Sequence, residues 1–281
     1  MADVYARITE VDPAVVERIG EILELRAADE QQRAMRAEYL AEIAFPDHAR
    51  VLEVGCGQGP VARALASMPG IGEVVGVDPS PIFVEKARAL ADGLASLSFM
   101  EGDARALPLE DRSFDVVIFH TTLCHVPRPE LALAEAARVL REDGWLAVFD
   151  GDYATTTVAL SDHDPLQACA EAAVSVLVHD RRLVRRLPTL VRAAGFEVVR
   201  VRSHGYVETA DPSYTLTLVD RGADALVAGG ELGPAAAGAL KAEARRRAAA
   251  GQWFGHIAYA SLIARPRGRD DPWRSPTPTR L

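Results

Sequence analysis

Short apolar runs alternate with longer helical segments between residues 50 and 152. The apolar runs are RVLEVG (50–55), EVVGVD (73–78), LSFMEGD (97–103), FDVVIFH (114–120) and WLAVFDGD (145–152). The helical segments between them are PVARALASM (60–68), PIFVEKARALADG (81–93) and RPELALAEAARVLRE (128–142). Strands that alternate with helices of this length form a parallel sheet with helices on both faces. Such strands are buried on both sides and are apolar throughout, as they are here. The sequence therefore predicts an α/β chain.

The segments on either side of this core follow other patterns. Residues 1–45 have apolar positions at helical spacing and are predicted to form an N-terminal helical cap before a core domain at 46–152. Residues 153–250 are predicted to form a helical lid with a sixth strand at about 196–207, and 153–180 are expected to be helical. A last core strand is expected at 251–266. The polar, proline-rich tail at 267–281 is predicted to be disordered.

The charge and composition of the chain limit what it can bind. Its formal net charge is -9 and its pI is about 5.3, so its field repels nucleic acid. No apolar run approaches the roughly 20 residues of a membrane span, and the polar N-terminal segment lacks the apolar centre of a signal peptide. We therefore expect a cytoplasmic monomer or homodimer that acts on a small molecule. Three scattered cysteines, Cys56, Cys124 and Cys169, argue against a disulfide framework and a structural zinc.

The first predicted strand runs into a glycine-rich loop, VLEVGCGQGP (51–60). Ligands of open parallel sheets bind at the carboxyl ends of the strands, where this loop lies. A dinucleotide site has the spacing G-x-G-x-x-G. This loop instead has G-x-G-x-G, with Glu53 before it and Pro60 after it. Glu53 is unfavourable beside a pyrophosphate, but it suits a cofactor that carries positive charge and no phosphate.

Two further acids end the next two predicted strands. Asp78 ends the second strand, where a carboxylate can accept hydrogen bonds from both hydroxyls of a ribose. Asp103 ends the third strand in EGDARALP, where it can receive an adenine amine while Ala104 supplies a backbone N–H. Three acids at the ends of successive strands converge on one crevice. Together with the glycine spacing they indicate S-adenosyl-L-methionine, which has a sulfonium and an ammonium group.

At these residues the chain resembles the class I S-adenosylmethionine-dependent methyltransferases, in particular the UbiE-like group (methyltransferase type 11) that acts on small molecules. The similar segments are VLEVGCGQG, VVGVDPS, EGDARALPL and SFDVVIFHTTLCHVPRPELALAEAARVLREDGWLAVFD, within about residues 48–151. The resemblance implies a Rossmann-like, doubly wound seven-stranded sheet in the order 3-2-1-4-5-7-6, with an antiparallel last strand. It also implies cofactor contacts from Glu53, Gly55, Gly57, Asp78, Asp103 and Ala104. We add to this predicted site Cys56, Gly59, Pro79 and His120.

Histidines and an acid on later strands are candidates for catalysis. His120 ends the fourth strand and His125 follows on a short loop, and either could accept a proton near neutral pH. Asp152 follows the fifth strand and could form a base with a nearby histidine. His204 lies on the sixth strand and could close over a substrate. The alternative for each of these side chains is a structural role: each histidine would be held by hydrogen bonds, and Asp152 would cap a loop.

Three further side chains are predicted to contact the acceptor. Tyr153 follows the fifth strand, His179 lies in the lid, and Tyr206 lies on the sixth strand. The neighbouring pair Arg181 and Arg182 could hold an acidic acceptor, although a run of charges is typical of a solvated helix face. No metal is expected, because the sequence has no HExxH, facial triad or CxxC pattern.

The resulting hypothesis is a biosynthetic methyltransferase that acts on a hydroxyl or an activated carbon of a small organic molecule and releases S-adenosyl-L-homocysteine. Two alternatives share the cofactor. One is a member of the same fold that catalyses a cyclisation or rearrangement without methyl transfer, and the other is a non-catalytic module that binds the cofactor. An oxidoreductase that uses NAD(P) is a fourth hypothesis. The acceptor and the methylated atom are not encoded in these motifs.

Overall fold

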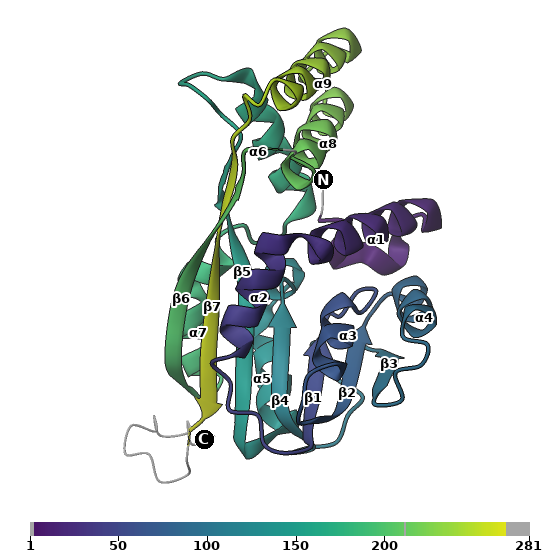
Figure 1. Ribbon diagram of the computed structural model, residues 1–281, viewed down its shortest axis with the longest axis vertical. Coiled ribbons are helices and arrows are strands. Elements are labelled where there is room, and N and C mark those ends of the chain that lie inside the picture. Colours follow the sequence, from purple (N-terminus) through teal and green to yellow (C-terminus); the bar gives the residue numbers. More distant parts are fainter. Residues whose placement is uncertain (1–2, 211, 268–281) are drawn as a thin grey trace, which may run out of the picture.

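Seven strands form one sheet in the order β3-β2-β1-β4-β5-β7-β6 (Figure 1). The computed structural model describes residues 3–210 and 212–267. In it β1 to β5 pair in parallel, and β7 runs antiparallel to both β5 and β6. The predicted strand order and the antiparallel last strand are confirmed. The strands are β1 (Ala49–Val54), β2 (Ile71–Asp78), β3 (Leu97–Glu101), β4 (Phe114–His120), β5 (Leu140–Thr157), β6 (Phe196–Glu208) and β7 (Gly255–Pro266).

The register of the central strands brings polar side chains together at one edge of the sheet. Glu53 of β1 pairs with Gly76 of β2 and with Ile118 of β4. Those two strands then end at Asp78 and His120. Because parallel strands point the same way, their carboxyl ends lie at the same edge. The register therefore places the predicted cofactor acids and His120 around one point.

Helices cover both faces of the sheet (Figure 1). In this view α2 (Glu30–Leu40) crosses in front of β4 and β5, while α5 (Pro129–Val139) and α7 (Leu183–Ala193) lie behind the sheet. α3 (Pro60–Ala66) and α4 (Pro81–Leu90) follow β1 and β2. Three of these helices, α3, α4 and α5, begin with proline. Proline suits the first helical position because no helix partner exists there for the N–H that it lacks.

The N-terminal cap lies across the carboxyl ends of the strands. It consists of the 3-10 helix η1 (Tyr5–Glu10), α1 (Pro13–Ala28) and α2. Asp12 and Asp29 cap α1 and α2, accepting hydrogen bonds from the backbone N–H groups of Ala14 and Gln32 at 2.9 Å. The cap is fastened to the sheet domain by a small apolar cluster of Ile8, Val16, Ile19 and Phe83, the last of which belongs to α4. This packing fixes α1 above the edge where the acids meet.

A second helical cluster packs at the far end of β5, β6 and β7 (Figure 1). It contains α6 (Pro165–Leu177), α8 (Tyr214–Ala228) and α9 (Pro234–Ala249), which share an apolar core that includes Trp253. The expectation that 153–180 is helical is wrong at its start. β5 continues to Thr157, because that end of the strand pairs with His256 of β7, and α6 begins only at Pro165.

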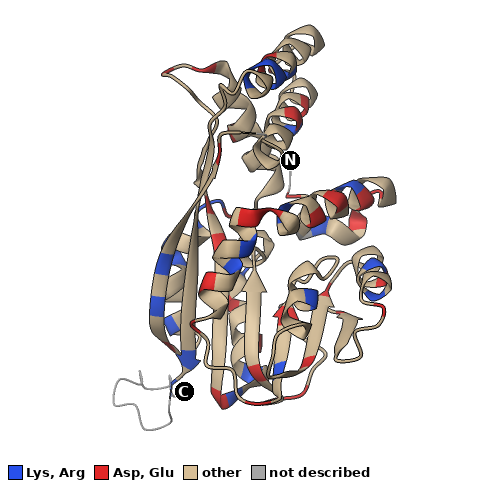
Figure 2. Cartoon of the chain, viewed as in Figure 1, with Lys and Arg blue, Asp and Glu red and all other residues tan. Residues whose placement is uncertain are grey.

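Charged side chains gather on the helices, on β6 and at the ends of the strands, while the central strands are almost free of them (Figure 2). No helix in the described residues is long and apolar enough to cross a membrane. Residues 268–281 of the tail predicted to be disordered lie outside the described residues. The remaining residue of that tail, Arg267, continues from β7, and its N–H donates to the carbonyl of Gly195 at 2.9 Å.

Candidate cofactor and active site

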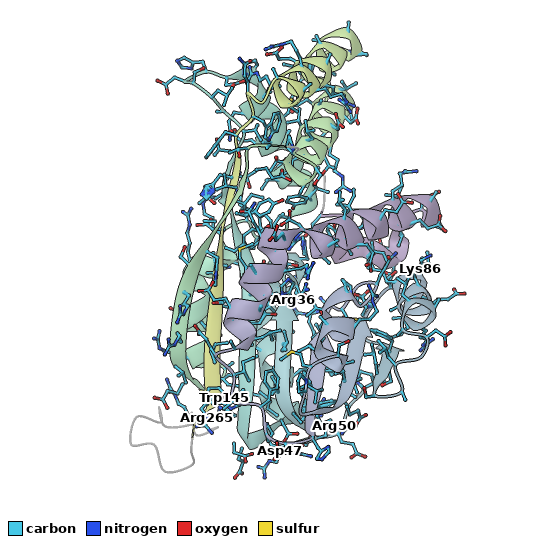
Figure 3. All side chains as sticks on the ribbon, in the orientation of Figure 1. Arg36, Asp47, Arg50, Lys86, Trp145 and Arg265 are labelled. Atoms are coloured by element: carbon cyan, nitrogen blue, oxygen red, sulfur yellow. The ribbon has the colours of Figure 1, made fainter. Side chains whose placement is uncertain are left out.

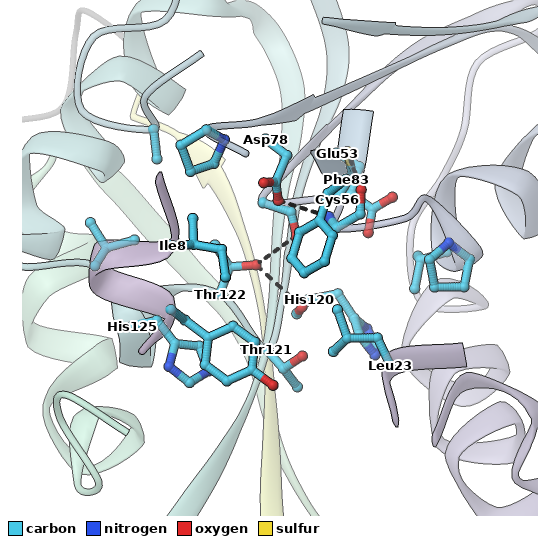
Figure 4. A pocket seen from close by; sticks show the side chains of 18 of the residues that line it. Ile8, Leu23, Glu53, Cys56, Asp78, Phe83, His120, Thr121, Thr122 and His125 are labelled. Atoms are coloured by element: carbon cyan, nitrogen blue, oxygen red, sulfur yellow. Dashed lines mark hydrogen bonds between the residues drawn. The ribbon is translucent and has the colours of Figure 1, made fainter. Parts of the chain in front are cut away.

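A cavity of about 560 Å³ lies at the carboxyl ends of the strands, beneath the N-terminal cap (Figure 4). Its walls come from the glycine loop after β1, from the segments that follow β2, β3 and β4, and from η1, α1 and α2. Its size is within the range of sites that enclose a drug-sized molecule. The sheet thus supplies the floor of the cavity and the N-terminal cap supplies its roof.

The three glycines of the loop have different reasons to be glycine. Gly55, Gly57 and Gly59 all have positive φ, at 74°, 54° and 78°. A Cβ on Gly55 would lie 2.2 Å from Thr122 Cγ2, and one on Gly59 would lie 2.4 Å from Phe99 Cζ. A Cβ on Gly57 would meet only Leu23 Cδ1, at 3.1 Å. Gly55 and Gly59 are therefore required by internal packing, whereas Gly57 gives a ligand access to the backbone.

Glu53 is buried at the floor of the cavity with one oxygen unused. Its side chain is 2% exposed, and Oε2 has no hydrogen-bond partner among the described residues. Burial raises the pKa of Glu53 to about 8, although the backbone N–H of Ala62 and the charge of Arg36 act in the opposite direction. Arg36 projects from α2 into the same region (Figure 3). A buried carboxylate oxygen without a donor indicates that a donor comes from a ligand.

Asp78 is fixed beside the glycine loop. Its two oxygens accept hydrogen bonds from the N–H groups of Gly57 and Ser80, at 2.8 and 2.9 Å. Burial raises its pKa to about 6, and these two hydrogen bonds limit the rise. Pro79 and Cys56 line the cavity next to it. Asp78 thus connects the end of β2 to the loop after β1.

Asp103 stands at the opposite wall of the cavity, after β3, with Ala104. Its oxygens accept hydrogen bonds from the guanidinium of Arg105 at 2.6 and 2.9 Å, and this pairing lowers the pKa of Asp103. Its side chain is 45% exposed. The sequence reasoning identified Asp103 but not its partner Arg105, which also lines the cavity.

Two of the predicted catalytic histidines line the cavity (Figure 4). His120 Nδ1 lies 3.0 Å from the Tyr39 hydroxyl, and its ring stacks on Phe149 at 4.8 Å. Burial, and then the nearby arginines of the cap, hold the pKa of His120 well below its usual value. His125 Nδ1 lies 2.9 Å from Asp3 Oδ2. His120 is therefore neutral near pH 7, while His125 is paired with a carboxylate.

The other predicted catalytic side chains lie outside the cavity lining. Asp152 accepts a hydrogen bond from Arg185 of α7 at 2.7 Å, on the far side of the sheet from α2. His204 is held between Glu38, at 3.2 Å, and Ser261, at 2.9 Å. The structure does not bring either of them to His120.

The predicted acceptor contacts are also spread out. Tyr153 lines a small recess that adjoins the main cavity. Tyr206 is fully buried, and its hydroxyl donates to Glu208 at 2.9 Å. His179 is exposed and contributes its backbone N–H to Asp3 at 2.7 Å. Of these three side chains, only Tyr153 borders space connected with the cavity. No group of three or more metal-ligating side chains gathers in the described part of the chain.

Among the cavity residues that the sequence did not predict are three polar side chains of the N-terminal cap, Arg26, Gln32 and Arg36. The sequence contains a signal for Arg26. This residue continues the apolar series that runs through Ile19 and Ile22 at helical spacing, so it faces inward although it is charged. A charged residue in the apolar stripe of a helix is a reason to expect a site.

Comparison with known proteins agrees with this geometry. Residues 52–148 match the family profile described as a methyltransferase domain. The matched segment contains the glycine loop, Asp78, Asp103 and His120. Over these residues the chain is similar to this methyltransferase domain family.

Two relatives of this chain show how far the similarity extends. An uncharacterized 37.1 kDa protein of a Streptomyces fradiae transposon is 32% identical over 200 residues, which are 65% of this chain and 56% of that protein. The demethylmenaquinone methyltransferase of Staphylococcus aureus is 32% identical over 130 residues, 46% of this chain and 54% of that enzyme. The chain thus spans about half the length of these relatives.

A solved structure has the same fold over almost the whole chain. The structure of the [4+2]-cyclase SpnF superposes with a TM-score of 0.58 and 23% sequence identity, covering 95% of this chain and 98% of that one. At this identity the likeness concerns the fold alone. It extends the shared architecture beyond the core to the N-terminal cap and the distal helices.

The residues of the site fit S-adenosylmethionine. The unused Oε2 of Glu53 is an acceptor for an ammonium group, and Arg36 beside it can bind a carboxylate. Gly57 leaves the backbone open to close approach. Asp78 lies within reach of the same loop and remains able to accept from ribose hydroxyls through its free lone pairs. The amino-acid part and the ribose of the cofactor therefore each have a matching group.

Proposed function

We propose that this protein transfers the methyl group of S-adenosylmethionine to a hydroxyl or an activated carbon of a small organic molecule. The observation that carries the proposal is the buried, unpartnered oxygen of Glu53 in a cavity shared with Gly57 and Asp78. A carboxylate there suits a cofactor with a cationic amino-acid end. The bound cofactor supplies an activated methyl carbon, so the protein mainly has to align the acceptor and exclude water.

The enclosure of the cavity supports a small acceptor. η1 and α1 cover it, and the apolar cluster around Phe83 holds them in place. A folded polymer would have to displace this roof, and the net charge of -9 disfavours polyanions. The methyl acceptor therefore enters the space that remains beside His120, His125 and the N-terminal cap.

For an acceptor that must lose a proton, we propose His125 as the base. Its Nδ1 is paired with Asp3, which leaves Nε2 for the acceptor, in the arrangement in which a carboxylate orients an imidazole. His120 has its Nδ1 engaged by Tyr39, and its low pKa keeps it neutral, so it can position an acceptor without repelling the cofactor. Asp152 and His204 are left out of this proposed set because neither lines the cavity.

The test combines cofactor binding with label transfer. Isothermal titration with S-adenosylhomocysteine measures binding, and a panel of small hydroxy and carbonyl compounds is incubated with cofactor carrying a deuterated methyl group. Mass spectrometry then identifies products that contain the label. A product without the label would instead support a cyclisation or rearrangement, and binding without any product would support a non-catalytic module.

The substitution Gly57→Leu tests the assignment of the loop. We expect it to abolish binding of S-adenosylhomocysteine while the protein stays folded, because a Cβ at this position meets only Leu23 and the rest of the side chain would extend into the cavity. Gly93→Leu is the matched control: Gly93 also has positive φ, at 85°, but no atom lies within 4 Å of its Cβ position. Both changes carry a strain of about 1 kcal/mol. Undiminished binding by Gly57→Leu would refute the proposed site.

A further inference from the structure

A charged group of the cavity, Arg26, forms no ion pair with any described residue. Arg26 of α1 lines both the main cavity and the adjoining recess. No carboxylate lies within ion-pair distance of it among the described residues. A guanidinium that is withdrawn from water without an ionic partner is costly unless a ligand compensates it. The inference below rests on the proposed function and concerns the acceptor.

The rings nearest to Arg26 are tyrosines, and a second arginine, Arg221, lines the same recess. Its guanidinium carbon lies 5.7 Å from the ring centroid of Tyr214 and 5.8 Å from that of Tyr259. Two further tyrosines, Tyr5 and Tyr153, interact with it electrostatically. Burial raises the pKa of Tyr5, Tyr153 and Tyr259, so these phenols stay neutral. The rings accommodate the cation, but they do not cancel its charge.

Asp3, the carboxylate that pairs with His125, is already occupied. It accepts hydrogen bonds from His125 and from the backbone N–H groups of Tyr5 and His179. Asp3 is only 4% exposed, and these contacts hold it in place. It is therefore unable to turn toward Arg26 without breaking several hydrogen bonds.

Two buried polar groups beside Arg26 also have no partner. Gln32 lines the cavity and is 2% exposed, yet neither atom of its amide group has a hydrogen-bond partner among the described residues. Tyr259 is 1% exposed, and its hydroxyl likewise has no hydrogen-bond partner among the described residues. Gln32 is close enough to lower the pKa of this hydroxyl, although the two groups do not reach hydrogen-bond geometry. Unpaired groups of this kind cost about 1–3 kcal/mol each and point to a missing partner.

The cofactor itself is better matched by the other arginine. Arg36 interacts electrostatically with Glu53, at the end of the cavity where the amino-acid part of the cofactor is proposed to bind. The charges of both arginines lower the pKa of His120, which lies between these two ends of the site. Arg36 can therefore serve the carboxylate of the cofactor, and Arg26 is left for the acceptor.

We propose that the methyl acceptor carries an anionic oxygen, a carboxylate or an ionised acidic hydroxyl, which binds to Arg26 with Gln32 and Tyr259 as neutral donors. One cation with two neutral donors matches a single negative charge, and the four tyrosine rings suit an aromatic or otherwise planar carrier. The same cation repels amines, so it selects against cationic acceptors. Arg26 is thus a residue that determines acceptor specificity.

The experiment uses matched anionic and neutral probes. Benzoate and benzamide represent the carboxylate and its neutral counterpart, and 4-nitrophenolate and 4-nitroanisole represent the ionised hydroxyl and its counterpart. Each is titrated calorimetrically into the full chain saturated with S-adenosylhomocysteine. We expect at least one anion to bind about tenfold or more tightly than its neutral counterpart. The anion that binds more tightly shows whether the negative charge of the acceptor is a carboxylate or an ionised hydroxyl.

Variants locate this preference. Arg26→Gln is expected to remove it, Arg26→Lys to retain it in part, and Arg18→Gln, an exposed arginine on the same helix, to leave it unchanged. Arg26→Lys keeps the test valid if Arg26→Gln fails to fold. The proposal is overturned if wild type shows no preference for either anion, or if Arg26→Gln keeps the wild-type preference. It is also overturned if Arg26→Gln, and not Arg36→Gln, weakens binding of S-adenosylhomocysteine.

These outcomes are separate from those of the proposed function. Binding of S-adenosylhomocysteine to wild type is measured first, without any probe. If it fails, the cofactor site itself is refuted. If it succeeds and the probes show no preference, only the role of Arg26 is refuted.

Discussion

Glu53 shows how a residue that is proposed to bind the cofactor can work against folding. Its burial raises its pKa from the usual 4.5 to about 8. In the unfolded chain the group ionises near its ordinary pKa, whereas in the folded protein it holds its proton to higher pH. The folded state therefore binds more protons than the unfolded state between these two values, and stability falls as the pH rises through that window.

The substitution Glu53→Gln is accordingly expected to stabilise the protein at alkaline pH and to weaken cofactor binding. The free energy of unfolding of wild type should decline from about pH 5 to about pH 8, and the variant should lack this decline, with a gap on the order of a few kcal/mol above pH 8. Urea unfolding at a series of pH values measures the gap. Calorimetry measures the loss of affinity for S-adenosylhomocysteine.

The control for this prediction is Glu101→Gln. Glu101 also lines the cavity, but it is exposed, so removing its charge should leave the pH dependence of stability as in wild type. Parallel stability curves for wild type and Glu53→Gln would show that the carboxylate ionises normally in the folded protein.

At the scale of elements, the hinge between α1 and α2 sets the roof of the cavity. Asp29 ends α1 and caps α2, accepting a hydrogen bond from the N–H of Gln32. Arg26 and Gln32 therefore lie on opposite sides of one capping residue. The direction of α2 relative to α1 decides whether the two side chains meet beside Tyr259.

We expect Asp29→Ala to cost about 1 kcal/mol of stability, the usual value of a lost N-cap. Because the change loosens the start of α2, it should also weaken benzoate binding in the presence of S-adenosylhomocysteine. Asp12→Ala removes the corresponding cap of α1 and serves as the control, with a similar loss of stability but little effect on benzoate. Thermal unfolding and calorimetry give the two quantities. Equal effects of both variants on benzoate would contradict a special role for the hinge.

The strands and the cofactor loop were predictable because their signals are local. Strands β1, β2 and β4 each contain a continuous apolar run, and Glu53, Asp78 and Asp103 stand at fixed places relative to the runs of the sheet. The helix expected at 128–142 ends at Val139, since the chain joins β5 immediately afterwards. Such boundaries depend on pairing between strands, which spacing alone does not specify.

The acceptor side was not predictable in the same way. His204 lies on β6, which β5 and β7 separate from β4, so its place at the end of a strand did not bring it to His120. Arg26 and Gln32 gain their meaning only from contacts with residues far along the chain, such as Tyr214 and Tyr259. Those contacts depend on how the N-terminal cap and the distal helices pack, which is a tertiary property.

At the scale of the whole molecule, the two halves of the proposed site depend on different parts of the chain. The cofactor half is built from the sheet domain and α2. The acceptor half also needs Tyr214, the first residue of α8, and Tyr259 of β7. α8 is joined to the sheet through Glu208 at the end of β6. This buried carboxylate accepts hydrogen bonds from the N–H groups of Ser213, Tyr214 and Thr215, at 3.0, 2.9 and 2.7 Å.

Glu208 thus serves the start of α8 as a capping group, and its negative charge suits the positive end of the helix dipole. Glu208→Ala leaves these N–H groups without an acceptor, and we expect the free energy of unfolding to fall by roughly 3 kcal/mol. Because α8 carries Tyr214, benzoate binding should weaken at least about tenfold, while affinity for S-adenosylhomocysteine stays within about twofold of wild type. Glu208→Gln keeps one acceptor oxygen, so its stability and its benzoate affinity should lie between those of wild type and Glu208→Ala.

The control is Asp220→Ala, which breaks an exposed ion pair with Arg245 on the same helical cluster and should change stability and benzoate affinity little. A parallel loss of both ligands in Glu208→Ala would mean that the two halves of the site do not depend on separate parts of the fold.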